Sequence, residues 1–415
     1  TTVRTIGTIP RFPRIIANGQ KMCGFAGILG TKKSENLNTL KKMVEIMHYR
    51  GPDQSDFLIL EQGMFAHKRL SIIDLSTHSS QPMISTDKRF SLVFSGELYN
   101  YIELRKILLS KGHNFTTKSD TEVMLKSFIE FGEDALNRFI GMFSGCFYDN
   151  KTKTALLFRD NFGQKPIFYS KSRNNNFLFS TEIKGLIAGG IEVRPNLNSI
   201  ARYLNQAIYD DDEETFFHGV KQLLPGEFII ITPDKKIKKK RWYNLQEKIS
   251  PKENLKSLRT EIIDLIYNST QLHMRSDVPV GLCLSGGLDS SALLTAISKT
   301  GNMTDNFTCL SLGFGKDFSE KVWINSATKQ FNLNSIILDF TPEDFLSSLK
   351  PMMWHLESPI GGLMNCGFKL IFEKANELGI TVLQDGTGLD EAFGGYQHHH
   401  NLFIAKAMID SHPKL

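Results

Sequence analysis

The stretch Val278-Pro279-Val280-Gly281-Leu282-Cys283-Leu284-Ser285-Gly286-Gly287-Leu288-Asp289-Ser290-Ser291 decides how the second half of this chain folds. Its first seven residues are mostly apolar and predict a buried strand, which a glycine- and hydroxyl-rich turn connects to a helix over 291–298. Unpaired N–H groups at the start of a helix favour an anion in such a turn, and glycines allow it to approach closely. No Gly-Lys-Ser/Thr follows, so the pattern predicts a phosphate-binding turn that is not a Walker loop. An ordinary strand-turn-helix corner is the alternative.

The sequence after Asn254 continues this alternation. Helical periodicity covers 255–273, 321–331, 345–356 and 368–378, and strands are expected at 307–313, 335–339 and 381–384. Strands separated by helices predict a doubly wound parallel sheet, in which ligands bind at the carboxyl ends of the strands.

A second informative feature is Cys23, which directly follows Met22. If Met22 is an initiator and is removed, Cys23 carries a free α-amine beside its own thiol. That amine can accept the thiol proton, so one residue supplies both the nucleophile and its base. A buried structural cysteine is the other interpretation of an isolated Met-Cys pair.

The residues before this pair, 1–21, contain four basic residues and no acidic one, and they begin with Thr rather than Met. We interpret residues 1–22 as an upstream or removed segment: a transit segment, a propeptide or, preferably, translated sequence before the true start. In each case the segment must be absent from the active protein, because it blocks the α-amine.

From Cys23 to about Gly190, short strands alternate with few helices. Strand patterns cover 24–29, 57–60, 90–94, 141–148, 155–159, 167–170 and 177–180, and helical ones cover 37–47, 101–111 and 121–130. Many strands with few helices predict two stacked sheets with helices outside.

The composition shifts between about Ile191 and Ser250, where we place the junction between two domains. Residues 210–214, Asp-Asp-Asp-Glu-Glu, are expected to form a solvated acidic loop. The basic run Lys235–Arg241 is expected to flank a hairpin, with nucleic-acid binding as a minor alternative.

The composition is that of an ordinary globular protein, with 41% hydrophobic and 22% charged residues among 415. A net charge of +5 over this length does not indicate a nucleic-acid surface, and no apolar run approaches the ~20 residues that a membrane helix needs. The five cysteines are scattered without a Cys-x-x-Cys pair, which favours a reducing cytoplasm over disulfides or zinc. They are Cys23, Cys146, Cys283, Cys309 and Cys366.

Motifs across residues 22–396 resemble the glutamine-dependent asparagine synthetases, in which a class II, N-terminal-nucleophile glutamine amidotransferase is fused to an ATP-pyrophosphatase synthetase domain. The matching segments are Met22–Gly24, His48–Asp53, His67–Asp74, Gln81–Met83, Gly96–Asn100, Ser119–Glu122, Arg159–Gly163 with Lys165-Pro166, Ser180–Lys184, Ser285–Ser291 and Asp390–Tyr396. The resemblance implies a mixed α/β fold. It implies a four-layer αββα glutaminase domain over 23–205, a connecting hairpin over 206–253, and an ATP-pyrophosphatase domain over 254–415 that is C-terminally incomplete.

The resemblance also assigns a glutamine site. Cys23 attacks the side-chain amide of glutamine and releases ammonia, and the guanidinium fork of Arg69 binds the α-carboxylate. Asp120 and Glu97 bind the α-ammonium group and the side-chain amide. Backbone groups of Leu70, Ser71, Ile72 and Ile73 line the pocket.

Ser95 departs from the family pattern, which has Asn-Gly-Glu at this place. There the asparagine side chain and the glycine N–H, here that of Gly96, form the oxyanion hole. Losing one such donor costs about 10²–10³ in rate. We therefore expect weakened glutamine turnover, unless the serine hydroxyl or a water bridges the gap.

The resemblance also implies an ATP-binding site. Its residues are Leu284, Ser285, Gly286, Gly287, Asp289, Ser290, Leu312, Asp385 and Gly386. Asp289 holds Mg²⁺ on the pyrophosphate, since a carboxylate among phosphate oxygens requires a bridging cation. Leu312 packs on the adenine, or alternatively belongs to the core.

The segment Asp385–Glu391 is a second departure, because asparagine-forming members read Ser-Gly-Glu-Gly-x-Asp-Glu. Asp385 replaces the serine, and Thr387 replaces a glutamate that handles the incoming ammonia, which removes a charge and a proton acceptor. Asp390 and Glu391 remain as the nearby carboxylates. The implied reaction is the amidation of an adenylated carboxylate, aspartate first, with a sugar acid or a small peptide as the alternative acceptor.

Two other classes of protein stay open. One is a glutaminase or an ammonia-using ligase in which the other half has decayed. The other is a regulatory relative that binds nucleotide or glutamine without turnover, against which intact Cys23, Asp120 and Asp289 argue. Small molecules are the expected partners, rather than nucleic acid or membranes, and a homodimer is left open.

Overall fold

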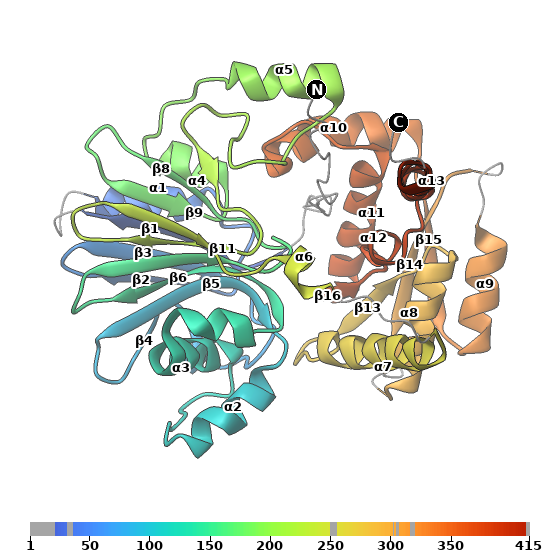
Figure 1. Ribbon diagram of the computed structural model, residues 1–415, viewed down its shortest axis with the longest axis horizontal. Coiled ribbons are helices and arrows are strands. Elements are labelled where there is room, and N and C mark those ends of the chain that lie inside the picture. Colours follow the sequence, from blue (N-terminus) through green and yellow to red (C-terminus); the bar gives the residue numbers. More distant parts are fainter. Residues whose placement is uncertain are drawn as a thin grey trace.

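The computed structural model describes residues 21–30, 36–249, 255–301, 303, 307–315 and 320–411. Figure 1 shows two bodies side by side, a sandwich of sheets from the N-terminal half and a sheet wrapped by helices from the C-terminal half. The predicted mixed α/β class is confirmed. Of the predicted upstream segment, residues 1–20 lie outside the described residues.

The sandwich consists of two six-stranded antiparallel sheets. The first sheet has the order β10 (Lys221–Gln222), β8 (Phe168–Lys171), β9 (Phe177–Ser180), β1 (Gly24–Leu29), β3 (Gly63–Arg69) and β2 (Gln54–Ile59). The second has the order β12 (Ile237–Arg241), β11 (Glu227–Ile231), β7 (Thr154–Arg159), β6 (Gly141–Asp149), β5 (Phe90–Leu98) and β4 (Met83–Ile84).

Aromatic side chains fill the space between the two sheets and drive their stacking. Phe25, Phe65 and Phe179 of the first sheet meet Tyr148 of the second in one buried cluster, and each such side chain contributes about 1.5–3 kcal/mol of burial. Helices α1 (Leu37–Glu45) and α4 (Ile183–Ala188) cover the first sheet, and α2 (Tyr101–Ser110) and α3 (Asp120–Phe131) lie on the side of the second. The predicted four-layer αββα arrangement is therefore confirmed.

The hairpin expected near the basic run is present, but it is part of the sandwich. Strands β11 and β12 pair with each other, and β11 continues the second sheet through β7. Residues 221–241 thus belong to the N-terminal body, and the segment between the domains is shorter than 206–253. Strand β3, which no predicted element covered, lies between β1 and β2.

The C-terminal sheet is parallel throughout, in the order β15 (Asn334–Asp339), β14 (Thr308–Gly313), β13 (Val280–Cys283) and β16 (Val382–Gln384). Helices α8 (Leu288–Lys299) and α9 (Lys321–Gln330) pack on one face with one apolar cluster, and α10 (Pro342–Leu356) and α11 (Leu363–Glu377) pack on the other face with a second cluster. This is the predicted doubly wound sheet. The remaining helices are α5 (Leu197–Gln206), α6 (Leu245–Lys248), α7 (Leu255–His273), α12 (Leu389–Phe393) and α13 (Gln397–Ser411), with 3₁₀ turns η1 (Thr77–Ser79) and η2 (Gly132–Arg138).

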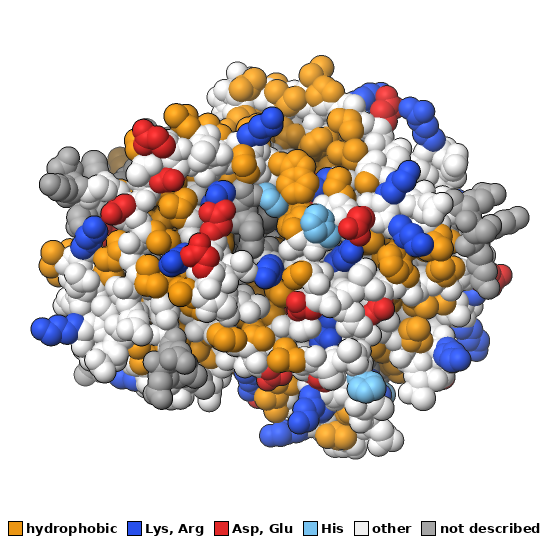
Figure 2. All heavy atoms as spheres, turned by 180° about the vertical axis from the view of Figure 1, so that it is seen from behind, with side chains coloured by type: hydrophobic (Ala, Val, Ile, Leu, Met, Phe, Trp, Pro, Cys, Tyr) orange, Lys and Arg blue, Asp and Glu red, His pale blue; other side chains and the backbone are white. Residues whose placement is uncertain are grey.

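The surface carries charges of both signs. Figure 2 shows Lys and Arg side chains interspersed with Asp and Glu across the face opposite to that of Figure 1. Among the described helices, none is both long enough and apolar enough to cross a membrane.

Candidate active site

Cys23 lies at the entrance to β1, directly beside the predicted glutamine pocket. Its Sγ is 3.4 Å from both the carbonyl oxygen and the backbone nitrogen of Leu70, which follows β3. Strands β1 and β3 are antiparallel neighbours with Gly24 opposite Lys68, so the sheet itself brings the thiol to this loop. The predicted nucleophile and the first pocket residue are therefore in contact.

The Cys23 thiol needs a base. Burial raises its pKa to about 12, although the backbone of Leu70 opposes that rise. A thiol with this pKa is ionised in only about one molecule in 10⁵ at neutral pH, and the thiolate is the nucleophile. If Cys23 is the nucleophile, it therefore requires an acceptor beside the thiol, and a free α-amine on Cys23 itself is the closest that this residue can have.

Arg69 is held from behind by the loop that follows it. Its Nη1 donates to the carbonyl of Ser76 at 2.7 Å, and its Nη2 donates to the carbonyl of Asp74. The side chain is only 6% exposed. A guanidinium fixed by two backbone carbonyls keeps its other N–H groups in a set direction, as recognition of a carboxylate requires.

Asp120 and Glu97 form the acidic side of the same site. Asp120 begins α3, and its Oδ2 accepts from the backbone N–H of Leu98 at 2.9 Å. Burial raises the pKa of Asp120 to about 6, and burial followed by the charge of Asp120 raises the pKa of Glu97. Together with Arg69, both carboxylates act electrostatically on the Cys23 thiol, so the four predicted side chains lie around one point.

Ser95, which departs from the family pattern, bonds to the backbone of Cys23. Its hydroxyl donates to the carbonyl oxygen of Cys23 at 2.7 Å, and the side chain is buried. Gly96 beside it has φ +131°, and a Cβ there would lie 1.8 Å from the carbonyl oxygen of Met142. The close approach of β5 and β6 thus demands a glycine, whereas the serine holds the carbonyl group of Cys23.

The loop formed by Leu70, Ser71, Ile72 and Ile73 is tied down at several points. Leu70 and Ile73 are each 6% exposed, and the N–H of Ser71 donates to Asp53 Oδ2 at 2.8 Å. The backbone of this loop is therefore held in place, and its binding of glutamine stays a prediction.

The sequence analysis gave no role to a set of buried charged residues next to Cys23. Arg50 Nε donates to the Cys23 carbonyl at 3.1 Å, and Arg50 Nη1 to Glu182 at 2.9 Å. Lys165 is 8% exposed, and burial lowers its pKa to about 8. Their motifs were matched to the family as patterns, but only the fold reveals that they surround the nucleophile.

The predicted phosphate-binding turn follows β13 as expected, but α8 begins at Leu288 rather than Ser291. Asp289 and Ser290 therefore belong to the first turn of the helix. Ser285 and Ser290 bond to each other through their hydroxyls at 3.0 Å, and Gly286 has φ +79°. The turn thus has the positive-φ glycine and the hydroxyl cluster that its sequence predicted.

The β16 loop lies against this turn. A Cβ on Gly386 would be 3.4 Å from the Cβ of Asp289, and the N–H of Thr387 donates to Asp385 Oδ1 at 2.8 Å. Burial, and then the charges of Asp390 and Glu391, raise the pKa of Asp289. The predicted ATP and acceptor residues from both strand ends are therefore together.

Leu312 lies in the core, which was the alternative to an adenine contact in the sequence analysis. It is 8% exposed, it belongs to the core cluster under α10 and α11, and it packs against Gly367 of α11. Its side chain therefore belongs to the core, and its contact with adenine stays a prediction.

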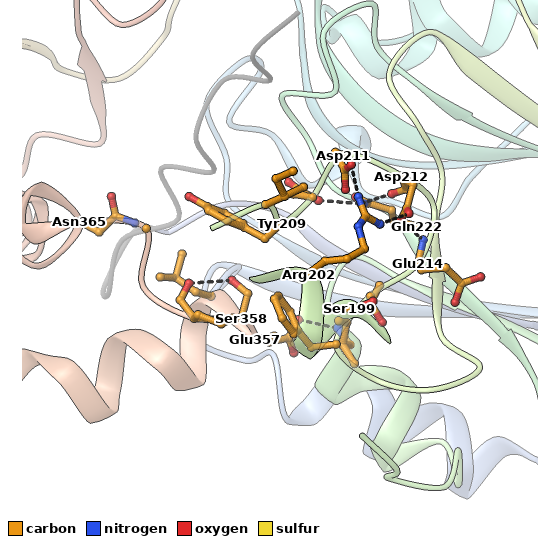
Figure 3. Close-up of a pocket in the computed structure, with 18 residues that line it drawn as sticks. Ser199, Arg202, Tyr209, Asp211, Asp212, Glu214, Gln222, Glu357, Ser358 and Asn365 are labelled. Carbon is orange, nitrogen blue, oxygen red and sulfur yellow. Dashed lines mark hydrogen bonds and ion pairs between the residues drawn. The ribbon is translucent and has the colours of Figure 1, made fainter. Parts of the chain in front are cut away.

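The acidic run is not a solvated loop, so that prediction was wrong. Residues 210–214 are partly buried, and all of them except Glu213 line a cavity beside Glu357 of the C-terminal domain, where Figure 3 labels Asp211, Asp212 and Glu214. Arg202 pairs with Asp211 and Asp212, which offsets their charge. The cavity, about 40 Å³, has room for a few water molecules.

Two family models match the two halves of the chain. The glutamine amidotransferase domain model matches residues 22–243, more than half of the chain, and the asparagine synthase model matches residues 261–413. The chain belongs to the glutamine-dependent asparagine synthetase family.

Individual relatives agree with this family. The glutamine-hydrolysing asparagine synthetase 1 of Bacillus subtilis is 32% identical over 90% of this chain and 59% of its own length. A Methanocaldococcus jannaschii protein, provisionally named a glutamine-hydrolysing asparagine synthetase, is 31% identical over 92% of this chain and 76% of its own. The amidase chyE of Penicillium rubens is 27% identical over 90% and 59%. The chain thus spans about three fifths of the first of these relatives.

Proposed function

We propose that this protein hydrolyses glutamine at Cys23 and uses the ammonia to amidate a carboxylate that ATP has activated, with aspartate as the acceptor and asparagine as the product. The observation that carries the proposal is the contact of the Cys23 thiol with Leu70, at a place where the charges of Arg69, Glu97 and Asp120 act on that thiol. The same chain carries a phosphate-binding turn at the ends of β13 and β16.

In this mechanism the peptide bond between Met22 and Cys23 is cleaved first. The freed α-amine takes the thiol proton, and the sulfur attacks the amide carbon of glutamine. Arg69 binds the α-carboxylate, and the N–H of Gly96 donates to the developing oxyanion. Ammonia leaves with the proton, and water then releases glutamate from the thioester.

In the second half, the acceptor carboxylate attacks the α-phosphorus of ATP and pyrophosphate leaves, after which ammonia displaces AMP from the acyl-adenylate. Ser285, Gly286, Gly287 and Ser290 orient the phosphates in this proposal. An internal path keeps ammonia from protonation in bulk water, and a closed site protects the adenylate from hydrolysis.

Asp289 fits a role as a ligand of Mg²⁺. No group of three potential metal ligands converges among the described residues, but Mg²⁺ commonly takes only one or two carboxylates and completes its shell with phosphate oxygens and water. Asp390 and Glu391 add negative charge that favours a cation beside Asp289. When bound, the ion neutralises charge on the pyrophosphate.

The cytoplasm is the compartment that we propose. All five cysteines are free thiols, as the reducing interior of a cell maintains them.

A different carboxylate is the second candidate acceptor, and Thr387 favours it. A neutral threonine stands where asparagine-forming members carry a glutamate, and relatives named amidases match the chain over the same 90%. A sugar acid or a small peptide would serve as the acceptor.

Two assays test the proposal. Cys23→Ala should abolish the release of glutamate from glutamine, whereas Cys146→Ala, at a buried cysteine outside the site, should not. A pyrophosphate-release assay that scans carboxylate acceptors identifies the second substrate. Aspartate as the only productive acceptor contradicts the second candidate, and glutamate release by Cys23→Ala contradicts the glutaminase mechanism itself.

A further inference from the structure

Glu357 of the C-terminal domain reaches into the N-terminal domain. It ends α10 with φ +55°, and its carboxylate accepts from the backbone N–H groups of Ile183 and Lys184 at 2.6 and 2.5 Å. It also pairs with the Lys184 ammonium at 3.1 Å, and its side chain is 7% exposed. This carboxylate therefore fixes both the start of α4 and a buried cation.

The contact continues from Lys184 to the nucleophile. Lys184 Nζ pairs with Glu182 at 2.9 Å, Glu182 pairs with Arg50 at 2.9 Å, and Arg50 Nε donates to the carbonyl oxygen of Cys23 at 3.1 Å. The side chains of Lys184, Glu182 and Arg50 are 7%, 3% and 1% exposed. The orientation of the Cys23 backbone therefore depends on a row of buried ion pairs that starts in the other domain.

This row is balanced in charge only while Glu357 is part of it. Arg50 and Lys184 supply two cations, and Glu182 and Glu357 supply two anions. Tyr49 donates its hydroxyl to Glu182 at 2.6 Å and adds no charge. Without Glu357, one buried cation lacks its counter-charge, and the row can regain balance only by moving toward water.

A second contact reaches the other end of the glutamine site. Asp277, shortly before β13, donates its N–H to the carbonyl of Ile72 at 2.9 Å and accepts from the N–H of Asp74 at 2.8 Å. The carbonyl of Asp74 is one of the two that hold Arg69. The C-terminal domain thus also braces the loop behind the group that binds the α-carboxylate.

We propose that the C-terminal domain completes the glutaminase site through two positioning residues, Glu357 acting on Cys23 and Asp277 acting on Arg69. The proposal rests on the function proposed above. The two residues act on different steps, since the nucleophile governs turnover whereas Arg69 governs the binding of glutamine. They therefore predict two different kinetic signatures.

The first test replaces Glu357 in the full chain and follows glutamate release. Glu357→Gln keeps the shape but loses the charge, and we expect kcat to fall about tenfold with KM for glutamine within twofold. Glu357→Asp keeps the charge and should recover most of the loss. Glu343→Gln, at an exposed glutamate on the same helix, is the matched control and should behave as wild type.

A double-mutant cycle identifies the route. Lys184→Met alone should lower kcat about as much as Glu357→Gln, and the combined variant should lose little more than either one, because both break the same row. If the fold reduction of kcat in the combined variant equals the product of the two single reductions, the proposed route through Lys184 is wrong.

The second test replaces Asp277. Asp277→Ala should raise KM for glutamine about five- to tenfold with kcat within twofold, whereas Asp277→Asn keeps an oxygen acceptor for Asp74 and should stay close to wild type. ATP affinity, measured by calorimetry, reports that the C-terminal domain of each variant is folded.

The outcomes separate the two proposals. Folded Glu357→Gln and Asp277→Ala proteins with wild-type kcat and KM would overturn the positioning role and leave the proposed function intact, provided that Cys23→Ala is inactive. Glutamate release by Cys23→Ala would instead overturn the proposed function. A loss in Glu343→Gln equal to that in Glu357→Gln would show a general effect of charge on α10 and would also overturn the positioning role.

Discussion

The two halves of this protein build their candidate sites in opposite ways. Around Cys23, Arg69, Asp120 and Ser95 are 6%, 4% and 1% exposed. Asp120 and Ser95 are bonded to residues from other parts of the fold, and Arg69 is bonded to the loop that follows it. In the phosphate-binding turn, Leu288 is 85% exposed, and the bonds of Ser285 run to residues within the turn. The first site is preorganised by the sandwich, whereas the second is a local turn that a ligand can complete.

This difference predicts which substitutions impair each site. A preorganised site depends on the packing of distant elements, and small shifts of its backbone reduce catalysis strongly. A local turn depends on its own residues and tolerates changes around it.

The largest expected effect comes from adding one methyl group to each site. Gly96→Ala places a Cβ 1.8 Å from the carbonyl oxygen of Met142 at φ +131°, so β5 must move and glutamate release should fall about a thousandfold or more. Gly287→Ala meets only Ser285 Oγ at 3.3 Å, at φ −69°, and should leave glutamate release unchanged. Equal glutaminase activity of the two variants would contradict the comparison.

The next effect concerns Arg69, the proposed ligand of the α-carboxylate of glutamine. Arg69→Lys keeps the charge but loses the fork and its bonds to Asp74 and Ser76, so kcat/KM for glutamine should fall about 10²-fold, mainly through KM. Arg89→Lys, at a partly exposed arginine paired with Asp149, is the control. A change confined to kcat would show that Arg69 does not bind the carboxylate.

Local patterns made much of the fold predictable from the sequence. The strand-turn-helix at Ser285, the alternation of helices and parallel strands and the two-layered first half each depend on neighbouring residues. The structure also reveals elements that depend on contacts between residues distant in the sequence. Strand β3 was missed because its sequence, with His67, Lys68 and Arg69, looks polar, yet His67 is fully buried in the sandwich.

The candidate sites were predictable to different degrees for the same reason. Individual motifs pointed to Cys23 and Arg69 through the family resemblance, but the buried ion pairs connect residues that lie far apart in the chain. Arg50 and Glu182 are 132 positions apart, and Lys184 and Glu357 are 173 positions apart. The acidic run at 210–214 was misjudged as solvated because its partner Arg202 lies on a different element. Tertiary pairing of charges is not encoded in local composition.

A smaller effect tests the departure at Ser95. An asparagine there is longer and carries two N–H donors, so Ser95→Asn should raise kcat for glutamine about tenfold if its amide reaches the oxyanion. Ser95→Ala removes the bond to the Cys23 carbonyl and should lower kcat instead. Identical rates for all three proteins would show that position 95 neither positions the nucleophile nor completes the hole.

The smallest expected effect is a change of stability with pH, which a buried histidine of the N-terminal half should cause and an exposed histidine should not. Burial lowers the pKa of His67 to about 3, although its hydrogen bond to Phe94 opposes this. The unfolded chain takes up this proton below about pH 6.5, whereas the folded chain stays neutral, so His67 lowers stability as the pH falls from 6.5 toward 3. Between pH 7.5 and 5.5 the expected loss is about 1.4 kcal/mol.

Urea unfolding of the N-terminal domain within the full chain measures this loss. His67→Gln can still donate to the Phe94 carbonyl but cannot titrate, so its stability should fall less over the same interval by about that 1.4 kcal/mol. His398→Gln, at an exposed histidine of α13, is the control. If the stability of His67→Gln falls with pH as much as that of the wild type, then His67 is not the group whose protonation destabilises the sandwich. The pH dependence of stability would then not support the contrast between a buried first site and an exposed second one.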